Sequence, residues 1–158
     1  MSVDSLAQSP ISLALEYLVI APLNERYLPT VHAALRIAAG LTFATHGFQK
    51  LFGWFGGMGP NGGTVELMSR FGAAGVIEVV CGVCLIIGLG TRLMAFIASG
   101  EMAVAYFWMH AAGSGQIFWW QNHGELVMLY SFIWLVFAAW GAGPLSVDEY
   151  LAKRGRAG

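Results

Sequence analysis

Apolar residues dominate four stretches of the chain, at 31–52, 72–90, 93–112 and 125–142. Each approaches or meets the roughly 20 residues that a helix needs to cross about 30 Å of hydrocarbon. Short segments rich in glycine or polar residues separate them, including the glycine-rich run at 53–63 and the tight turn at 88–92. Glycines at such positions stop a helix and allow the chain to reverse. The pattern therefore predicts an all-α membrane protein with four transmembrane helices in an antiparallel up-down bundle.

Small residues recur along these stretches, among them Gly40, Ala44, Gly75 and Gly100. Membrane helices use small residues for close backbone approach, because lipid provides no hydrophobic drive for helices to associate. Four-helix bundles with short connections pack each helix beside the next one in the chain. We therefore expect a compact bundle, organised as one transmembrane domain over 31–148.

The two ends of the chain carry further predictions. Residues 11–21 are apolar but too short to span, and no basic leader precedes them, so 1–30 is expected to hold an interfacial helix. Residues 149–158 are expected to form a cytoplasmic tail. With four spans, six lysines and arginines fall on one side and two, Lys50 and Arg70, on the other. The six are Arg26, Arg36, Arg92, Lys153, Arg154 and Arg156. Cytoplasmic loops are rich in these residues, which predicts that both termini are cytoplasmic.

Composition agrees with a membrane protein and excludes other classes. The 158 residues are 57% hydrophobic and only 11% charged, against roughly 25% charged in soluble domains. The formal net charge is −1, with no basic stretch suited to nucleic acid. The bilayer is therefore the first expected partner, and nucleic acid is not expected.

Two acids, Glu78 and Glu101, lie inside the apolar stretches. A charged side chain at such depth costs roughly 2.5–3.5 kcal/mol, so it normally faces a partner or a water-filled cavity. Counted by depth, His46, Lys50, Glu78, His110 and Glu125 fall in the outer half of the bilayer, and Glu101 lies beneath them. This arrangement predicts one polar pocket open to the outer side.

The acids are expected to differ in state and role. Glu78 shares its depth with Lys50 and His46, so we expect it to be ionised and paired. Glu101 has no cation at its level, and we expect it to be neutral. Both are candidates for proton relay. The alternative is that a Lys50–Glu78 or His46–Glu78 pair only joins two helices, since buried pairs often specify packing without adding much stability.

Cys81 and Cys84 form a Cys-x-x-Cys pattern in the middle of the second stretch. Far from a helix N-terminus, such thiols pack as small hydrophobes, so packing is favoured over redox chemistry. The histidines lack the spacing of zinc ligands, and no metal site is predicted. Phosphate-binding loops and nucleophile elbows are missing from the sequence as well.

The order of several short motifs resembles the DoxX family of small membrane proteins. The motifs are Arg36, the run Thr45-His46-Gly47-Phe48-Gln49-Lys50, Gly75-x-x-Glu78-x-x-x-Gly82, Gly88-Leu89-Gly90-Thr91-Arg92, Asn122-His123-Gly124-Glu125, and Gly143-Pro144-Leu145-Ser146-Val147-Asp148. They cover roughly 31–148. Glu101 and the cysteine pair stand outside this pattern.

The resemblance implies a four-helix protein of the bacterial inner (plasma) membrane with a redox-linked role. Relatives of this family include DoxD-like subunits of a thiosulfate:quinone oxidoreductase, and mycobacterial members of a membrane oxidoreductase complex with superoxide dismutase and a sulfurtransferase. The family motif maps ligand-binding positions onto His46, Lys50, Glu78, Asn122 and Glu125. It maps structural positions onto Arg36, Gly47, Arg92 and Asp148.

Three functions follow as hypotheses. In the first, the chain is a quinone-associated protein or subunit, in which Lys50 or His46 donates to a quinone carbonyl and Glu78 or Glu101 relays protons. No redox centre is encoded, so electrons would come from a soluble or membrane redox partner or from the bound substrate. In the second, the chain is a non-enzymatic scaffold or assembly factor for a soluble partner. A small transporter is the third. Whether the chain is an enzyme stays open at this point.

Overall fold

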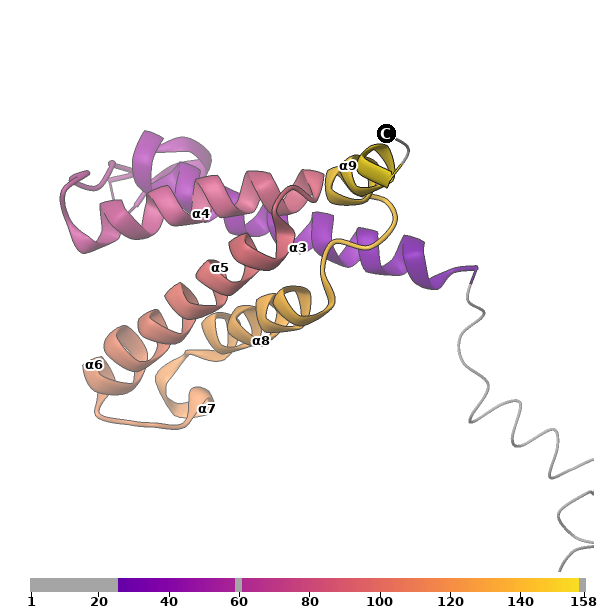
Figure 1. Cartoon of the computed structure of the whole chain (residues 1–158). Coiled ribbons are helices and arrows are strands. Elements are labelled where there is room, and N and C mark those ends of the chain that lie inside the picture. Colours follow the sequence, from indigo (N-terminus) through magenta and orange to yellow (C-terminus); the bar gives the residue numbers. More distant parts are fainter. Residues whose placement is uncertain (1–25, 59–60, 157–158) are drawn as a thin grey trace, which may run out of the picture.

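The computed structural model describes residues 26–58 and 61–156, and over these residues the fold is helical (Figure 1). The prediction of an all-α protein is confirmed; an isolated bridge between Met58 and Gly63 is the only β pairing among the described residues. The predicted helix at 11–21 lies outside them. The elements are α3 Leu28–Phe52, η1 Trp54–Gly56, α4 Arg70–Ile87, α5 Thr91–Ala105, η2 Tyr106–Ala111, α6 Ala112–Ser114, α7 Trp119–Asn122, α8 Glu125–Trp140 and α9 Val147–Arg156.

Long helices stand at each of the four apolar stretches. α4 is long and apolar enough to cross a membrane by length and composition, and it is the one described helix that meets both conditions. α8 is apolar but has 16 residues. α3 is longer but less apolar on average than α4. α5 has 15 residues and continues into the π-helical turn η2.

Helix boundaries follow local residue chemistry. α3 has a proline in its first turn and ends at Gly53, whose φ of 69° is left-handed. The Ser69 side chain caps α4 by accepting a hydrogen bond from the Gly72 backbone N–H, at 3.1 Å. α4 ends at Gly88, which has a φ of 71° and begins the turn into α5.

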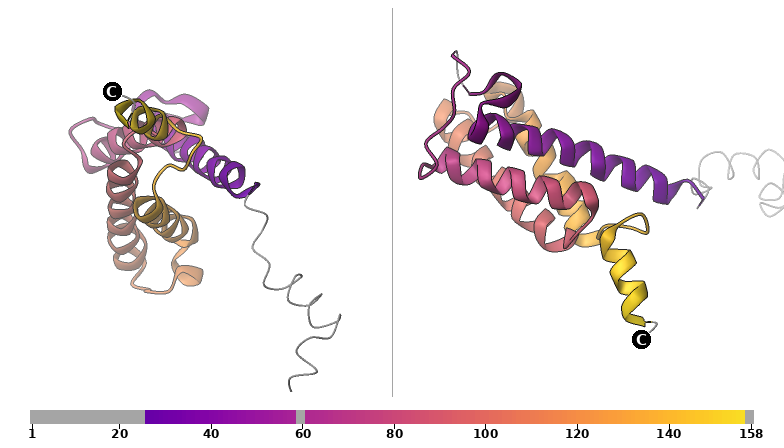
Figure 2. Two further views of the ribbon diagram at one scale, coloured as in Figure 1. Left: turned by 45° about the vertical axis from the view of Figure 1, so that its right-hand side comes forward. Right: turned by 90° about the horizontal axis from the view of Figure 1, so that it is seen from above.

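The four long helices form two pairs. α3 lies against α4, α5 lies against α8, and the pairs diverge from the α4–α5 turn (Figures 1 and 2). This arrangement is more open than the compact bundle that the sequence predicts. α3 and α8 meet through large rings, such as Phe43 and Trp134 with centroids 5.5 Å apart. Such bulky side chains keep the two backbones apart.

Glycines bring α3 and α4 together. A Cβ placed on Gly47 would lie 2.7 Å from the Gly75 carbonyl oxygen, and one on Gly82 would lie 2.8 Å from the Ala44 Cβ. A Cβ on Gly40 would lie 2.9 Å from the Ile86 side chain of α4. The expected close approach is therefore present at this interface. Gly100 differs, because no atom lies within 4 Å of the position that its Cβ would occupy.

One end of the molecule, called the capped end here, brings together the end of α4, the start of α5, the end of α8 and the start of α9. Arg36 is 1% exposed. Its guanidinium donates to four carbonyl oxygens, those of Leu85, Ile86, Ala142 and Leu145, at 2.5, 2.7, 3.2 and 2.6 Å. The carbonyls that end α4 lack partners within the helix, so Arg36 satisfies them while it holds the segment after α8.

Two further side chains complete the capped end. The exposed Arg92 donates to the last carbonyls of α8, including that of Ala139 at 2.5 Å. The Asp148 carboxylate accepts from the N–H groups of Gly90 and Thr91, at 2.7 and 2.9 Å. An acid at a helix N-terminus satisfies free donors and complements the helix dipole. The opposite end, the cavity end, contains the sequence-predicted pocket residues.

Candidate functional site

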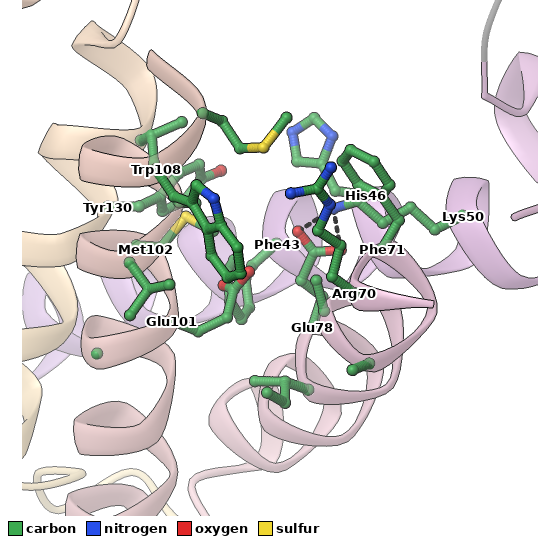
Figure 3. A pocket seen from close by; sticks show the side chains of 18 of the residues that line it. Phe43, His46, Lys50, Arg70, Phe71, Glu78, Glu101, Met102, Trp108 and Tyr130 are labelled. Atoms are coloured by element: carbon green, nitrogen blue, oxygen red, sulfur yellow. Dashed lines mark hydrogen bonds and ion pairs between the residues drawn. The ribbon is translucent and has the colours of Figure 1, made fainter. Parts of the chain in front are cut away.

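A cavity of about 580 Å³ lies between the two helix pairs (Figure 3). α3, α4, α5, η2 and α8 all contribute to its lining. His46, Lys50, Glu78, Glu101 and His110 are among the lining residues, so the structure brings together five of the polar residues that the sequence placed at similar depth. Most of the other lining residues are apolar, including Phe43, Ile77, Met102 and Tyr130. The cavity therefore combines an apolar body with a few polar groups, as small-molecule sites generally do.

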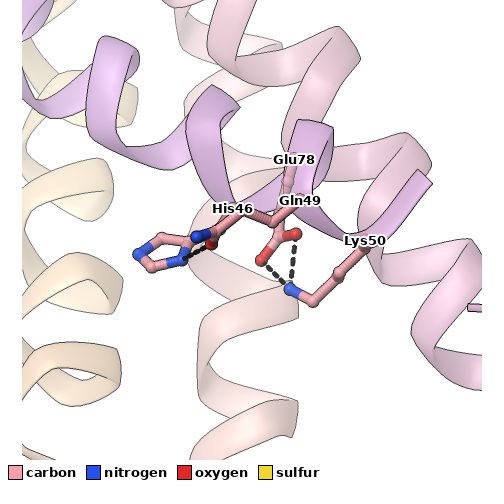
Figure 4. A network of polar contacts seen from close by, with 4 residues as sticks. All are labelled: His46, Gln49, Lys50 and Glu78. Carbon is pink, nitrogen blue, oxygen red and sulfur yellow. Dashed lines mark hydrogen bonds and ion pairs between the residues drawn. The ribbon is translucent and has the colours of Figure 1, made fainter. Parts of the chain in front are cut away.

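Lys50 and Glu78 form an ion pair between α3 and α4 (Figure 4). The Lys50 ammonium donates to both carboxylate oxygens of Glu78. The Lys50 side chain is 15% exposed and that of Glu78 is 3% exposed. The predicted pairing thus occurs with the lysine, and it holds one carboxylate in a fixed orientation at the cavity wall.

His46 lies one helical turn before Lys50 on the same face of α3. Its Nδ1 is 3.2 Å from the Gln49 Oε1, and the Gln49 amide in turn donates to the Phe55 carbonyl oxygen at 3.2 Å. This chain of contacts orients the imidazole from the segment after α3. The ring remains among the cavity-lining residues, with its Nε2 not used in that contact.

Glu101 enters the cavity from α5, opposite Glu78 (Figure 3). Its Oε2 is buried and has no hydrogen-bond partner among the described residues. Buried polar atoms without a partner are uncommon and call for an explanation, such as a bound molecule. Glu101 is therefore a buried polar group that the cavity leaves available to an occupant.

Arg70 is a cavity residue that the sequence analysis counted only as an outer charge. It begins α4, and its guanidinium carbon lies 5.2 Å from the centre of the Trp108 ring and 5.7 Å from that of Phe71. Both distances are within cation–π range, and the contact with Trp108 connects α4 to η2 across the opening between the helix pairs. No sequence signal pointed to this contact, because it depends on the angle between the pairs.

The π-helical turn η2 was also missed. It places Trp108, Met109 and His110 in the cavity lining. A π-turn inserts one extra residue into a helix and shifts which side chains face inward, and such turns are frequent at functional sites. A regular helix would carry Glu101, Ala105 and Trp108 on the cavity side, but not His110 as well.

Two predicted ligand residues lie outside the lining. Asn122 is 5% exposed, and its amide contacts Gln116 at 2.9 Å and the Gly124 N–H at 2.9 Å, so it shapes the loop before α8. The backbone carbonyl oxygen of Asn122 lies 3.0 Å from the Nδ1 of His110. Glu125 is exposed at the first residue of α8. Both residues are close in sequence to the cavity-lining residue Leu126, but neither side chain lines the cavity.

The remaining candidates have structural surroundings. Arg36, Arg92 and Asp148 form the capped end, and Gly47 lies in the α3–α4 contact, as described above. Cys81 and Cys84 are both free thiols, with the Cys81 Sγ 3.9 Å from the Met94 Sδ. Within 26–58 and 61–156, no group of three or more histidine, cysteine or acidic side chains is arranged to hold a metal ion.

Comparisons with known proteins give one family model and two similar proteins. The DoxX family model matches residues 31–111. An uncharacterized protein of Haemophilus influenzae is 42% identical over 135 residues, which cover 82% of this chain and 97% of that protein. An uncharacterized membrane protein of Mycobacterium tuberculosis is 31% identical over 137 residues, which cover 78% of this chain and 82% of that protein. No solved structure matches the chain significantly.

Proposed function

Because the chain belongs to the DoxX family of membrane proteins, we propose that its cavity binds the headgroup of a quinone that enters from the bilayer. The observation that carries the proposal is the pairing of a mostly apolar cavity with Glu101, whose Oε2 has no partner among the described residues. A quinone has an apolar ring and two carbonyl oxygens, and it matches a cavity with few but well-placed polar groups.

The proposal includes an orientation in the bacterial inner membrane. α3, α4, α5 with its π-turn, and α8 cross the bilayer, and the capped end faces the cytoplasm with both termini. Arg36 and Arg92 lie at this end, together with the basic last turn of α9. Lysine and arginine accumulate on the cytoplasmic side of membrane proteins. The cavity then opens in the outer half of the bilayer.

Each polar residue has a distinct role in this proposal. Lys50 and His46 donate hydrogen bonds to a quinone carbonyl oxygen, while the ion pair with Lys50 keeps Glu78 in place. A neutral Glu101 carries a proton to the ring, as intramembrane acids commonly do. Reduction of a quinone to a quinol takes up two electrons and two protons. The electrons come from a redox partner protein or from a substrate that the quinone oxidises.

Quinone binding by purified protein in lipid nanodiscs tests the proposal directly. Gly100→Leu should weaken binding at least tenfold, because Gly100 lines the cavity and the added side chain meets no atom within 4 Å of its Cβ. Glu101→Gln should retain binding but slow the protonation that accompanies reduction. Glu125→Gln, an exposed change outside the cavity, is the matched control. Equal quinone affinity in wild type and Gly100→Leu would refute the proposal.

A second candidate function is a scaffold or assembly factor, and the Lys50–Glu78 pair favours it because the pair joins α3 to α4. In that case Glu78→Gln should lower the stability and cellular abundance of the protein, since it leaves the partly buried Lys50 ammonium without its charged partner. Quinone turnover in membranes would then fall only in proportion to abundance. A larger fall per molecule of protein supports the quinone site instead.

A further inference from the structure

α9 is fixed to the capped end by its first turn. Ser146 caps the helix by accepting from the Glu149 N–H at 3.2 Å. The Asp148 backbone N–H donates to the Gly88 carbonyl oxygen at 2.9 Å, and the Asp148 carboxylate holds the start of α5. These contacts place the beginning of α9 at the level where α4 ends and α5 begins.

From this attachment α9 runs away from the helix pairs. Seen from above in Figure 2, α3 and α4 lie along one direction and α9 crosses it at a steep angle. If α3 and α4 cross the bilayer, a helix in this orientation lies along the membrane surface at the capped end. It does not continue outward as an extended tail.

The side chains of α9 are divided as in a surface-bound helix. Tyr150 and Leu151 are 58% and 51% exposed, and the preceding Leu145 is 57% exposed. The last turn carries Lys153, Arg154 and Arg156, all exposed. The Arg154 guanidinium carbon lies 5.7 Å from the Tyr150 ring centre, so its stem runs over the apolar face. A basic amphipathic helix with an aromatic residue on its apolar face is typical of binding in the headgroup layer.

Charges within α9 leave an excess of positive charge at its free end. Asp148 is engaged by the α5 N–H groups, and Glu149 pairs with Lys153 at 3.5 Å. Arg154 and Arg156 have no acidic partner among the described residues. This end therefore complements a negatively charged surface. A soluble protein partner fits less well, because the apolar face consists of few side chains and an arginine crosses it.

We propose that α9 lies in the headgroup layer at the capped end and binds anionic phospholipids, with Tyr150 and Leu151 inserted and the two arginines on the phosphates. The proposal does not depend on what the cavity binds. Each basic residue near an anionic surface contributes about a fivefold preference for it. Arg154→Gln together with Arg156→Gln should therefore reduce the preference for anionic lipid about 25-fold.

Nitroxide labels on the full-length protein in nanodiscs provide the test. Leu151→Cys and Lys153→Cys place labels on the apolar and polar sides of α9, in a background with Cys81→Ala and Cys84→Ala. In phosphatidylglycerol, the label at 151 should be accessible to oxygen and shielded from a water-soluble nickel complex, and the label at 153 should show the reverse. In phosphatidylcholine, or with the two arginines replaced, the shielding at 151 should fall.

A matched variant and a second measurement separate charge from folding. Glu149→Gln removes the acid beside Lys153 and should increase retention of phosphatidylglycerol in native mass spectra. The paired arginine change should reduce that retention, without a change in thermal unfolding of the helix pairs. Equal nickel accessibility at 151 and 153 in both lipids overturns the proposal, as does lipid retention that ignores the arginines.

Discussion

Replacement of Arg36 by methionine should be among the most destabilising single changes in the described part of the chain. Arg36 is 1% exposed and donates to four carbonyl oxygens, two at the end of α4 and two in the segment after α8. Methionine fills a similar volume but donates nothing. Four acceptors, two in buried and two in partly buried surroundings, would then lose this donor.

The magnitude follows from those four acceptors. A buried acceptor left without a donor costs about 1–3 kcal/mol. The low end of that range applies because two of the four acceptors are only partly buried, and four acceptors then give a loss of about 4 kcal/mol. That is a large part of the about 5–15 kcal/mol by which proteins are ordinarily stable. The cost comes from carbonyls left without a donor, so Arg36→Lys should recover only part of it.

Arg92→Met is the matched control. Arg92 also donates to the carbonyls that end a helix, but its side chain is exposed. Water or lipid headgroups can replace it, so the loss should be about 1 kcal/mol or less. Reversible unfolding of the purified protein in mixed micelles measures both variants. Similar losses for the two arginines would refute the reasoning, because burial would then not decide the cost.

Three further changes test other parts of the structure. Gly47→Ala should cost about 1–3 kcal/mol in thermal unfolding because its Cβ meets the backbone of α4, while Gly100→Ala should cost nothing; equal effects would contradict the close contact. Asp148→Ala removes both acceptor oxygens and should cost about 1 kcal/mol, with amide hydrogen exchange at the start of α5 about fivefold faster. Unchanged exchange would exclude this capping role. Tyr106→Phe removes the hydrogen bond to the Ile117 carbonyl oxygen and should lower stability by about 1 kcal/mol. Amide hydrogen exchange in the loop before α8 should become faster. Unchanged exchange in that loop would show that the hydrogen bond contributes little.

The helices could be predicted because their signals are local. The stretch 31–52 corresponds to Leu28–Phe52, and 125–142 corresponds to Glu125–Trp140. Continuous apolar residues favour helices, and glycines such as Gly53 and Gly88 end them with left-handed backbone angles. The segment 149–158 was predicted only as a cytoplasmic tail, without a helix, yet it belongs largely to α9. The start of α9 is held by hydrogen bonds from the Gly90 and Thr91 N–H groups to Asp148, and these residues are far apart in the sequence.

The site could be predicted only in part, for a related reason. Depth along each apolar stretch placed Lys50, Glu78 and Glu101 at compatible levels, and all three line one cavity. Depth does not determine the angle between helix pairs, which places Arg70 over Trp108. Nor does it determine the π-turn, because the shift of one residue depends on how α5 packs against its neighbours. Asn122 shows the converse, since its depth suited the pocket, but its amide hydrogen-bonds to Tyr106, Gln116 and Gly124 and to none of the cavity-lining residues.

The two helix pairs are held together at the capped end and separate toward the cavity end. Arg36, Arg92 and Asp148 fix the helix ends there, whereas Arg70 is the side chain that reaches across the far opening. The helical run from Thr91 to Ser114 has a length of about 36 Å at 1.5 Å per residue. A rotation of about 5° at the joined tip therefore moves the other tip by about 3 Å at that length. A rotation near Asp148 would therefore change the space available to an occupant, and the contact of Phe43 with Trp134 between the pairs is what would resist it.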